Sequence, residues 1–264
     1  MRTSDFSLAP RQARADVVVV LERAGAARAW QRGARRAARG ASGHRWDTAY
    51  RLRDGARGVI AWFTTADDAA AFLATRPTDG ERHRALHAEP EGYTNGVWRA
   101  EGDVMAHVER FTPVTREVER GTVPPLVAAP GPARRAGARP ARPRGAGVPE
   151  VRSPADAQAL FVGATRYRGP HSWALLSREW YPMVAAMRRL PGYVWHGVYW
   201  EPPFTLGTIA FFATRDDLLV FARVPAHRRL MRWVTQGRRH GTGGWIRLHQ
   251  AAPEVPAARE DGGR

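Results

Sequence analysis

The sequence predicts an α+β fold in which one β-α-β-β-α-β unit occurs twice along a chain of 264 residues. The first observation is an internal repeat, because residues 43–72 match residues 192–221 at eleven of thirty positions without gaps. About two matches are expected at ordinary residue frequencies. The second observation is that apolar periodicity gives the same order of strands and helices on both sides of a stretch rich in Pro, Ala, Gly and Arg. We therefore predict an N-terminal unit at residues 14–115, a linker at 116–156 and a C-terminal unit at 157–252.

The first unit starts with the β-branched run DVVVVLE, which is typical of a buried strand, and continues with an Ala- and Arg-rich helix. Two strands follow around an Asp-Gly turn, and Asp67 with Asp68 begins a second helix, where acidic side chains suit the helix dipole. The expected elements are a strand at 16–22, a helix at 26–41, strands at 44–52 and 58–64, a helix from residue 67 and a closing strand at 104–113.

The second unit repeats this order. Its first helix has large apolar residues at near-helical spacing, among them Trp173 and Trp180, and it ends at Pro-Gly. Residues 192–233 predict two strands around a Pro-Pro turn and then one helix, which starts at Asp-Asp and carries His227 on its apolar face. The remaining elements are a strand at 160–167, the helix at 172–190 and a closing strand at 244–250.

A ferredoxin-like unit of this order covers one face of its sheet with helices, and the other face needs cover. Two such units placed face to face enclose a barrel-like interior, and cavities of this kind are common ligand sites. We therefore predict a duplicated dimeric α/β-barrel within one chain, present as a monomer or as a homodimer.

Composition excludes several functions. The chain has no cysteine, so disulfides, thiolate nucleophiles and cysteine metal sites are ruled out. The net charge of +16 comes from arginine alone and is spread over the whole sequence, which argues against nucleic acid as a partner and leaves peripheral contact with anionic membranes open. No apolar run approaches the roughly 20 residues of a membrane span, and the N-terminus lacks the apolar region of a secretory signal, so we expect a cytoplasmic protein.

The second half resembles the spheroidene monooxygenase family and related dimeric α/β-barrel monooxygenases. The residues that carry this resemblance are YVWHGVYWEPPF, GTIAFFATRDDLLVFA, VPAHRRLMRWV and GGWIRLH. They are similar to the family's glycine-containing strand, its Glu-x-Pro-Phe turn, a Thr-rich apolar strand, a helix with Phe-Ala and a histidine, and an aromatic closing strand. The resemblance covers roughly residues 157–250, and the first half resembles the family only in outline.

The resemblance implies a haem in the C-terminal half, with the helix histidine, here His227, as the ligand of the haem iron. A neutral imidazole is a good ligand for haem iron. From the residues alone, a histidine in the basic stretch HRRLMRW is more often a surface residue, and both interpretations stay open.

Aromatic residues on the strands of the second half are dense enough to line an apolar pocket. Ordinary core packing is the alternative for most of them. Trp200 and Phe204 stand out, because the repeat places Arg51 and Gly55 at their positions in the first half. The candidate pocket residues are Arg166, Trp195, His196, Tyr199, Trp200, Phe204 and Phe212.

Two other groups of residues give weaker signals of a site. Glu201 matches the carboxylate of the family's turn, where a structural role is favoured. His83 and His87 would share one face of a helix, the geometry of a two-histidine metal site, but a third ligand is not evident and His107 or Glu109 would be guesses.

The leading hypothesis is a haem-dependent monooxygenase that oxidises an apolar small molecule such as a polyene, an isoprenoid or another secondary metabolite. The alternative is a cofactor-free barrel monooxygenase or a non-catalytic binding protein of the same fold. The sequence identifies neither the substrate nor an electron donor.

Overall fold

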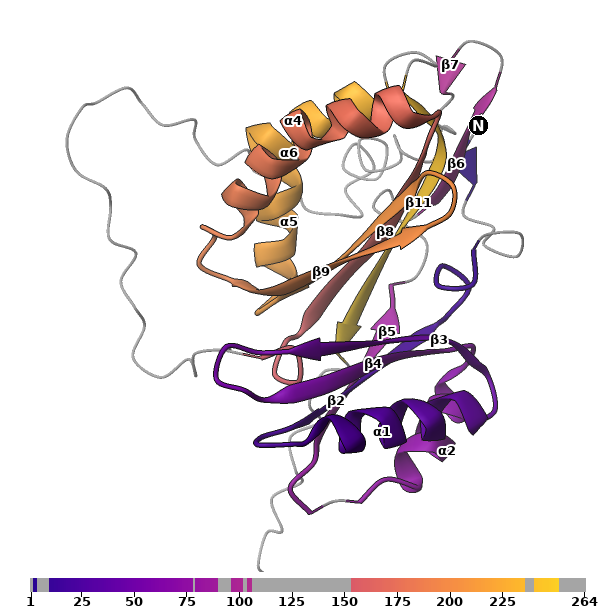
Figure 1. Ribbon diagram of the computed structural model, residues 1–264, viewed down its shortest axis with the longest axis vertical. Helices are drawn as coiled ribbons and strands as arrows, with labels where there is room; N and C mark the ends of the chain where they lie inside the picture. Colours follow the sequence, from indigo (N-terminus) through magenta and orange to yellow (C-terminus); the bar gives the residue numbers. More distant parts are fainter. Residues whose placement is uncertain are drawn as a thin grey trace, which may run out of the picture.

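The computed structural model describes residues 2–3, 10–77, 79–89, 96–101, 104–105, 153–235 and 240–251. These residues form a mixed α/β structure in which two groups of helices lie at opposite ends of the molecule, both on the outer face of a continuous antiparallel sheet (Figure 1). The predicted linker and most of its flanks lie outside the described residues, so the division of the chain into two units and a linker stays a prediction.

The first half contains the expected strand-helix-strand-strand-helix order. Its elements are β2 (Val17–Arg23), α1 (Arg28–Gly40), β3 (His44–Arg51), β4 (Arg57–Phe63), α2 (Ala66–Ala74) and β5 (Arg82–Ala88). Three short strands complete this part, namely β1 (Arg2–Thr3), β6 (Gly96–Glu101) and β7 (Val104–Met105).

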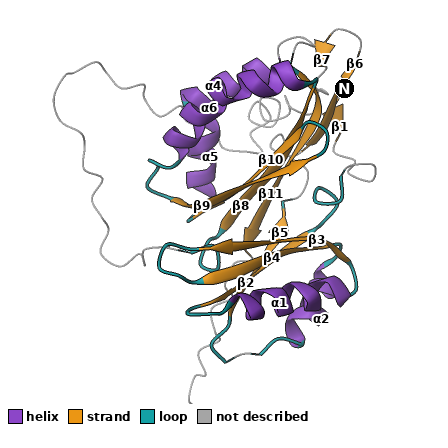
Figure 2. Cartoon of the chain, viewed as in Figure 1, coloured by secondary structure: helices purple, strands orange, loops and turns teal. Residues whose placement is uncertain are grey.

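The second half has the same order with one more helix. Its elements are β8 (Ala159–Tyr167), α4 (Pro170–Met187), β9 (Tyr193–Glu201), β10 (Thr205–Phe212), α5 (Arg215–Arg223), α6 (Pro225–Thr235) and β11 (Gly241–Ala251). Figure 2 shows α1 and α2 under the sheet at one end of the molecule and α4, α5 and α6 above it at the other.

The main sheet has the strand order β3-β4-β2-β5-β11-β8-β10-β9. Each half therefore contributes four strands in the order expected of a ferredoxin-like unit, and the halves join where β5 pairs antiparallel with β11. The edge strands β3 and β9 contact each other through side chains, with Trp46 4.9 Å from Tyr199 and Tyr50 5.3 Å from Trp195 between ring centroids. The sheet is thus nearly closed.

Two expectations from the sequence are wrong. The first is that residues 104–113 close the first sheet, whereas β5 takes that position beside β2. The sequence of β5, RHRALHA, is polar, and Leu86 is its one buried residue, so it lacks the apolar pattern that would identify it as a sheet strand. Of the stretch predicted to close the sheet, only Val104–Met105 is described, and it pairs with β6.

The second is the single helix expected around His227, which is in fact two helices. Val224 between them is extended, with φ −61° and ψ 141°, and Pro225 begins α6. Proline lacks the N–H that would continue α5, and it biases the preceding residue toward extended conformations. The break turns His227 back toward the sheet on a helix of its own.

The residues shared by the repeat hold the scaffold together. Thr65 caps α2 by accepting a hydrogen bond from the backbone N–H of Asp68, and Thr214 caps α5 by accepting one from Asp217. Three apolar clusters fill the space between elements. One lies between each half's sheet and its helices, and the third lies inside the nearly closed sheet, where it includes Tyr50, Trp62 and Phe211.

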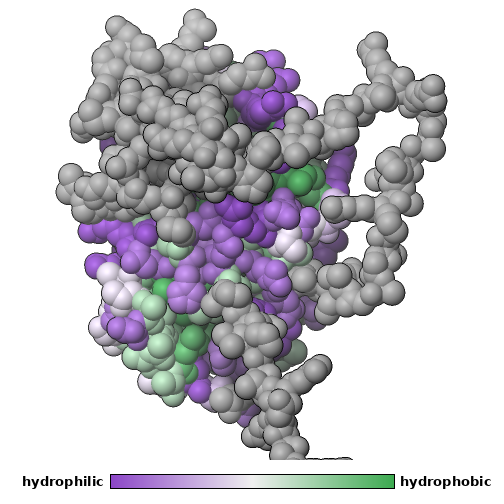
Figure 3. Space-filling view, turned by 180° about the vertical axis from the view of Figure 1, so that it is seen from behind, coloured by the Kyte–Doolittle hydropathy of each residue, from purple (hydrophilic) through white to green (hydrophobic). Residues whose placement is uncertain are grey.

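Arginine side chains form ion pairs at many separate places, such as Arg76 with Glu81, Arg229 with Glu179 and Arg247 with Asp16. The face in Figure 3 likewise shows hydrophilic side chains dispersed over its described part, with a hydrophobic area at the lower end. None of the helices in the described ranges is long and apolar enough to cross a bilayer.

Two glycines give a direct test of this packing. A Cβ added at Gly58 would overlap the ring of Tyr50, and one at Gly207 would overlap the ring of Tyr199. We expect Gly58→Ala and Gly207→Ala each to lower the free energy of unfolding by roughly 1–3 kcal/mol, because the tyrosine ring packed on each glycine would have to move. Urea unfolding measures this.

Gly33→Ala is the matched control, since Gly33 lies inside α1 and a Cβ added there would meet open space. It should raise the free energy of unfolding by about 0.5–1 kcal/mol through helix propensity. Equal stabilities for all three variants would contradict the aromatic packing described above.

Candidate functional site

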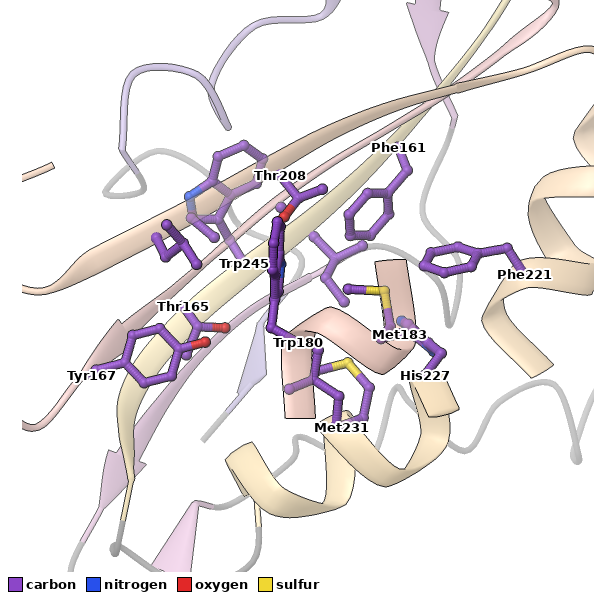
Figure 4. Close-up of a pocket in the computed structure, with 15 residues that line it drawn as sticks. Phe161, Thr165, Tyr167, Trp180, Met183, Thr208, Phe221, His227, Met231 and Trp245 are labelled. Carbon is purple, nitrogen blue, oxygen red and sulfur yellow. The ribbon is translucent and has the colours of Figure 1, made fainter. Parts of the chain in front are cut away.

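The described residues enclose a cavity of about 60 Å³ between the sheet of the second half and its helices (Figure 4). Strands β8, β10 and β11 form its floor, and helices α4, α5 and α6 form its roof. It lies on the helix side of the sheet, whereas the sequence predicts a ligand site inside the barrel. The barrel interior is filled by the aromatic cluster that includes Tyr50, Trp62 and Phe211.

Strand alternation builds the floor. Successive side chains of a strand point to opposite faces, so Phe161, Gly163, Thr165 and Tyr167 of β8 all face the helices. Gly163 leaves space there, because a Cβ would lie 3.0 Å from Cζ of Phe161 and 3.0 Å from the carbonyl oxygen of Trp245. The floor is therefore apolar, with the Thr165 hydroxyl and the Tyr167 phenol as polar groups at one end.

Helical spacing builds the roof. Trp180 and Met183 lie one turn apart on α4, and His227, Leu230 and Met231 occupy one face of α6. In Figure 4 the side chains of Trp180, Met183, His227 and Met231 converge from the helices over the strands. Methionine fills irregular space and repacks easily, which suits a cavity wall.

His227 is the most informative group in the cavity. Its Nδ1–H donates a hydrogen bond to the backbone carbonyl of Ala222 over 3.0 Å, which leaves Nε2 as the ring nitrogen with a lone pair. The ring packs on Phe221, with centroids 4.7 Å apart. Burial lowers the pKa of His227 to about 4, against the weaker opposing effect of the Ala222 carbonyl, so the imidazole is neutral at physiological pH.

Trp180 supplies the complementary group. Its indole N–H is buried and has no hydrogen-bond partner within the described parts of the chain. An unpaired buried donor costs free energy, so such groups call for an explanation. Nε2 of His227 and the N–H of Trp180 thus add one acceptor and one donor to the hydroxyl groups of Thr165 and Tyr167 in an otherwise apolar cavity.

Among the other residues named from sequence, Trp195 and Tyr199 face the opposite side of the sheet. Trp195 packs on Phe211 and Tyr50, and Tyr199 packs on Trp46. Phe212 is on the helix side, but it is fully buried and stacks on Phe221 at 5.6 Å. These positions belong to the packed core.

The remaining named residues lie outside the cavity lining. Trp200 is exposed on the outer face of β9, and Phe204 packs at the edge of the helix-side cluster. His196 Nδ1 lies 2.6 Å from the hydroxyl of Tyr193, and Arg166 is exposed on the strand face opposite Thr165. The structure thus brings His227 alone of the predicted set into the cavity lining.

The geometry expected for a metal at His83 and His87 is wrong, because both lie on strand β5 instead of a helix. Four residues along a strand span about 13 Å, too far for one ion. Within the described residues, no group of three metal-binding side chains comes together. His107 and Glu109 lie outside those residues, and Glu201 accepts a hydrogen bond of 2.5 Å from Gln12, in keeping with a structural role.

Sequence reasoning does not identify Trp180, Thr165 and Thr208 as site residues. In the sequence, Trp180 is visible only as part of an amphipathic helix, and the two threonines only as strand residues. The threonines are identified by the face of the sheet on which they lie, and Trp180 by the packing of α4 over that face.

No protein-family model and no curated protein matches this chain. Among solved structures, SnoaB, a cofactor-independent oxygenase from Streptomyces nogalater, is similar at 20% identity and a TM-score of 0.30, over 38% of this chain and 98% of that one. An antibiotic biosynthesis monooxygenase is similar at 18% identity and a TM-score of 0.31, over 36% and 99% of the two chains. A conserved protein from Methanosarcina mazei Go1 gives 14% identity and a TM-score of 0.32, over 37% and 96%. These similarities are too low to carry an argument about this chain.

The buried histidines predict an acid-labile fold. Between pH 6.5 and about 4 an unfolded His227 holds a proton that the folded one does not, so stability is highest above pH 6.5 and falls as the pH drops toward 4. Burial lowers the pKa of His249 to about 3, which acts in the same direction. We expect His227→Leu to reduce the loss of unfolding free energy between pH 7 and 4.5 by on the order of 2 kcal/mol.

Urea unfolding at a series of pH values measures this difference. His171→Leu is the control, because His171 is exposed at the start of α4 and its replacement should keep the wild-type pH dependence. A His227→Leu variant with an unchanged pH dependence would show that His227 is not held neutral by burial.

Proposed function

We propose that this chain binds an apolar small molecule with a hydroxyl or enolisable carbonyl group in the helix-side cavity, and oxidises it with O2 without a cofactor. The observation that carries the proposal is the neutral His227, whose Nδ1–H is held by the Ala222 carbonyl. Its Nε2 is a base in an apolar cavity that also contains the unpaired N–H of Trp180.

The chemistry follows from these two groups. Nε2 takes a proton from an acidic C–H of the substrate, and the N–H of Trp180 donates to the oxygen on which negative charge collects. O2 then adds to the electron-rich carbon, and His227 returns the proton to give a hydroperoxide. Loss of water leaves a new C=O group, so that CH2 plus O2 becomes C=O plus H2O. All electrons come from the substrate, and no separate electron donor is needed.

Haem, which the sequence resemblance implies, fits this cavity poorly. His227 has the right chemistry for an axial ligand, and haem would supply oxygen activation when bound. However, the cavity is about 60 Å³, whereas pockets for drug-sized ligands have roughly 300–1,000 Å³. We therefore infer that the substrate itself supplies the electrons that reduce O2, and that His227 acts as a base.

Oxygen uptake tests the proposed role of His227. With anthrone, an enolisable three-ring ketone, we expect the wild-type protein to consume O2 and His227→Gln to lose at least about 100-fold of that rate, since a positioned base contributes on this scale. An oxygen electrode gives the rate, and His171→Gln should behave as wild type.

The same variant separates catalysis from binding. His227→Gln should still bind 1-naphthol within a few-fold of wild type, because the amide oxygen replaces the lost acceptor. Trp180→Phe should weaken that binding about fivefold, the value of one neutral hydrogen bond. Binding without any O2 uptake by the wild type would instead favour the non-catalytic binding protein.

Absorption spectroscopy tests the haem alternative. Protein purified from cells supplied with a haem precursor is expected to show no stoichiometric Soret band, because the cavity lacks the necessary volume. A Soret band that His227→Ala removes or shifts would overturn this expectation and restore the haem-dependent mechanism.

A further inference from the structure

The cavity is too small to hold a whole substrate molecule. A protein cavity of about 150 Å³ accommodates benzene, whereas this one has about 60 Å³. If the proposed function holds, only the reactive end of a ligand lies between the sheet and the helices. The rest of the molecule has to lie on a surface next to the cavity lining.

The register of β10 and β9 identifies that surface. Leu206 and Thr208 of β10 line the cavity, and their partners on β9 are Trp200 and Val198. Residues directly opposite each other in an antiparallel pair point to the same face, with Cβ atoms about 5 Å apart. Trp200 and Val198 therefore continue the cavity floor outward onto β9.

Both side chains face solvent. Trp200 is 55% exposed and Val198 is 44% exposed, and they are two of the four exposed large apolar side chains in the described residues. A solvent-facing tryptophan next to an apolar cavity provides a flat surface for an aromatic or conjugated molecule.

Comparison with the first half shows that large apolar side chains at these exposed positions are particular to the second half. There, Arg35 and Arg39 of α1 bind Asp47 and hold the helix against the outer face of β3. The repeat places His196 at the position of Asp47, and α4 packs against α6. The outer face of β9 carries Val198 and Trp200 where β3 has Ala49 and Arg51.

We propose that Trp200 and Val198 form a platform, the β9 platform, for the distal part of the substrate, and that the substrate is therefore an elongated, flat, multi-ring or conjugated molecule. The inference rests on the proposed function and specifies its substrate class. A second protein chain is a poorer occupant, because a stable interface needs about 800 Å² per partner and an aromatic side chain offers at most about 250 Å².

Two fluorescent or absorbing probes with one hydroxyl group each test the platform, namely 1-naphthol with two rings and 1-hydroxypyrene with four. We expect the wild type to bind 1-hydroxypyrene at least about tenfold more tightly than 1-naphthol, since stacking on tryptophan adds to burial of the extra rings. Trp200→Ala should reduce this ratio to within about threefold, and Val198→Ala should reduce it less. Fluorescence titration gives both dissociation constants.

Arg51→Trp is the matched control, because it creates an exposed tryptophan at the equivalent position of the half that lacks the platform. It should leave both dissociation constants unchanged, which excludes non-specific stacking. If Trp200→Ala keeps the wild-type ratio of the two dissociation constants, while Trp180→Phe still weakens the binding of 1-naphthol, the platform is overturned and the proposed function stays intact.

Different results would contradict the proposed function itself. These are a Trp180→Phe variant that binds 1-naphthol as the wild type does and a His227→Gln variant that oxidises anthrone at the wild-type rate. Sedimentation velocity tests whether a second copy of this chain occupies the β9 platform instead of a small molecule. A wild-type dimer that Trp200→Ala converts to a monomer, with the probe ratio unchanged, would assign this surface to a second copy and overturn the platform.

Discussion

The pairing of β5 with β11 determines where this protein has room for a ligand. It joins the two halves into one sheet, and the sheet then curves until the edge strands meet through Trp46 with Tyr199 and Tyr50 with Trp195. These rings, with Trp62 and Phe211, fill the interior. Aromatic side chains of the described residues thus occupy the interior of the nearly closed sheet, and the cavity lies instead between the sheet and the helices of the second half.

Much of the fold could be predicted because the repeat carries local signals. The caps at Thr65 and Thr214 and the apolar strands between them are set by short-range chemistry. The closing strand of the first half could not be predicted from RHRALHA, since its pairing with β11 comes from a residue stretch more than 150 positions away. Pairing between distant segments leaves little trace in local periodicity.

Only part of the site could be predicted from the sequence, because the face on which a strand residue lies depends on pairing between distant segments. His227 could be identified through the family resemblance and its helix, although the structure places it on α6 after the break at Pro225. The aromatic residues of β9 and β10 were expected to share one pocket, but strand alternation sends Trp195 and Tyr199 to one face and Trp200 to the other. Deciding between the faces requires the register, including the irregularity between Phe211 and Phe212, which composition does not reveal.

The two halves also differ at one pair of opposed positions inside the nearly closed sheet. Glu22 pairs across the sheet with Arg82, and an ion pair joins them while the hydroxyl of Tyr50 donates to Glu22 over 2.7 Å. The matching register in the second half pairs Ala164 with Trp245, whose side chains belong to the apolar cluster inside the nearly closed sheet. The interior of the sheet therefore carries a charged pair at this position in the first half and apolar side chains in the second. On the other face of β8, the cavity is lined mainly by apolar side chains such as Phe161, Met183 and Phe221. An apolar surrounding disfavours the protonated imidazole, which is why His227 is neutral at physiological pH.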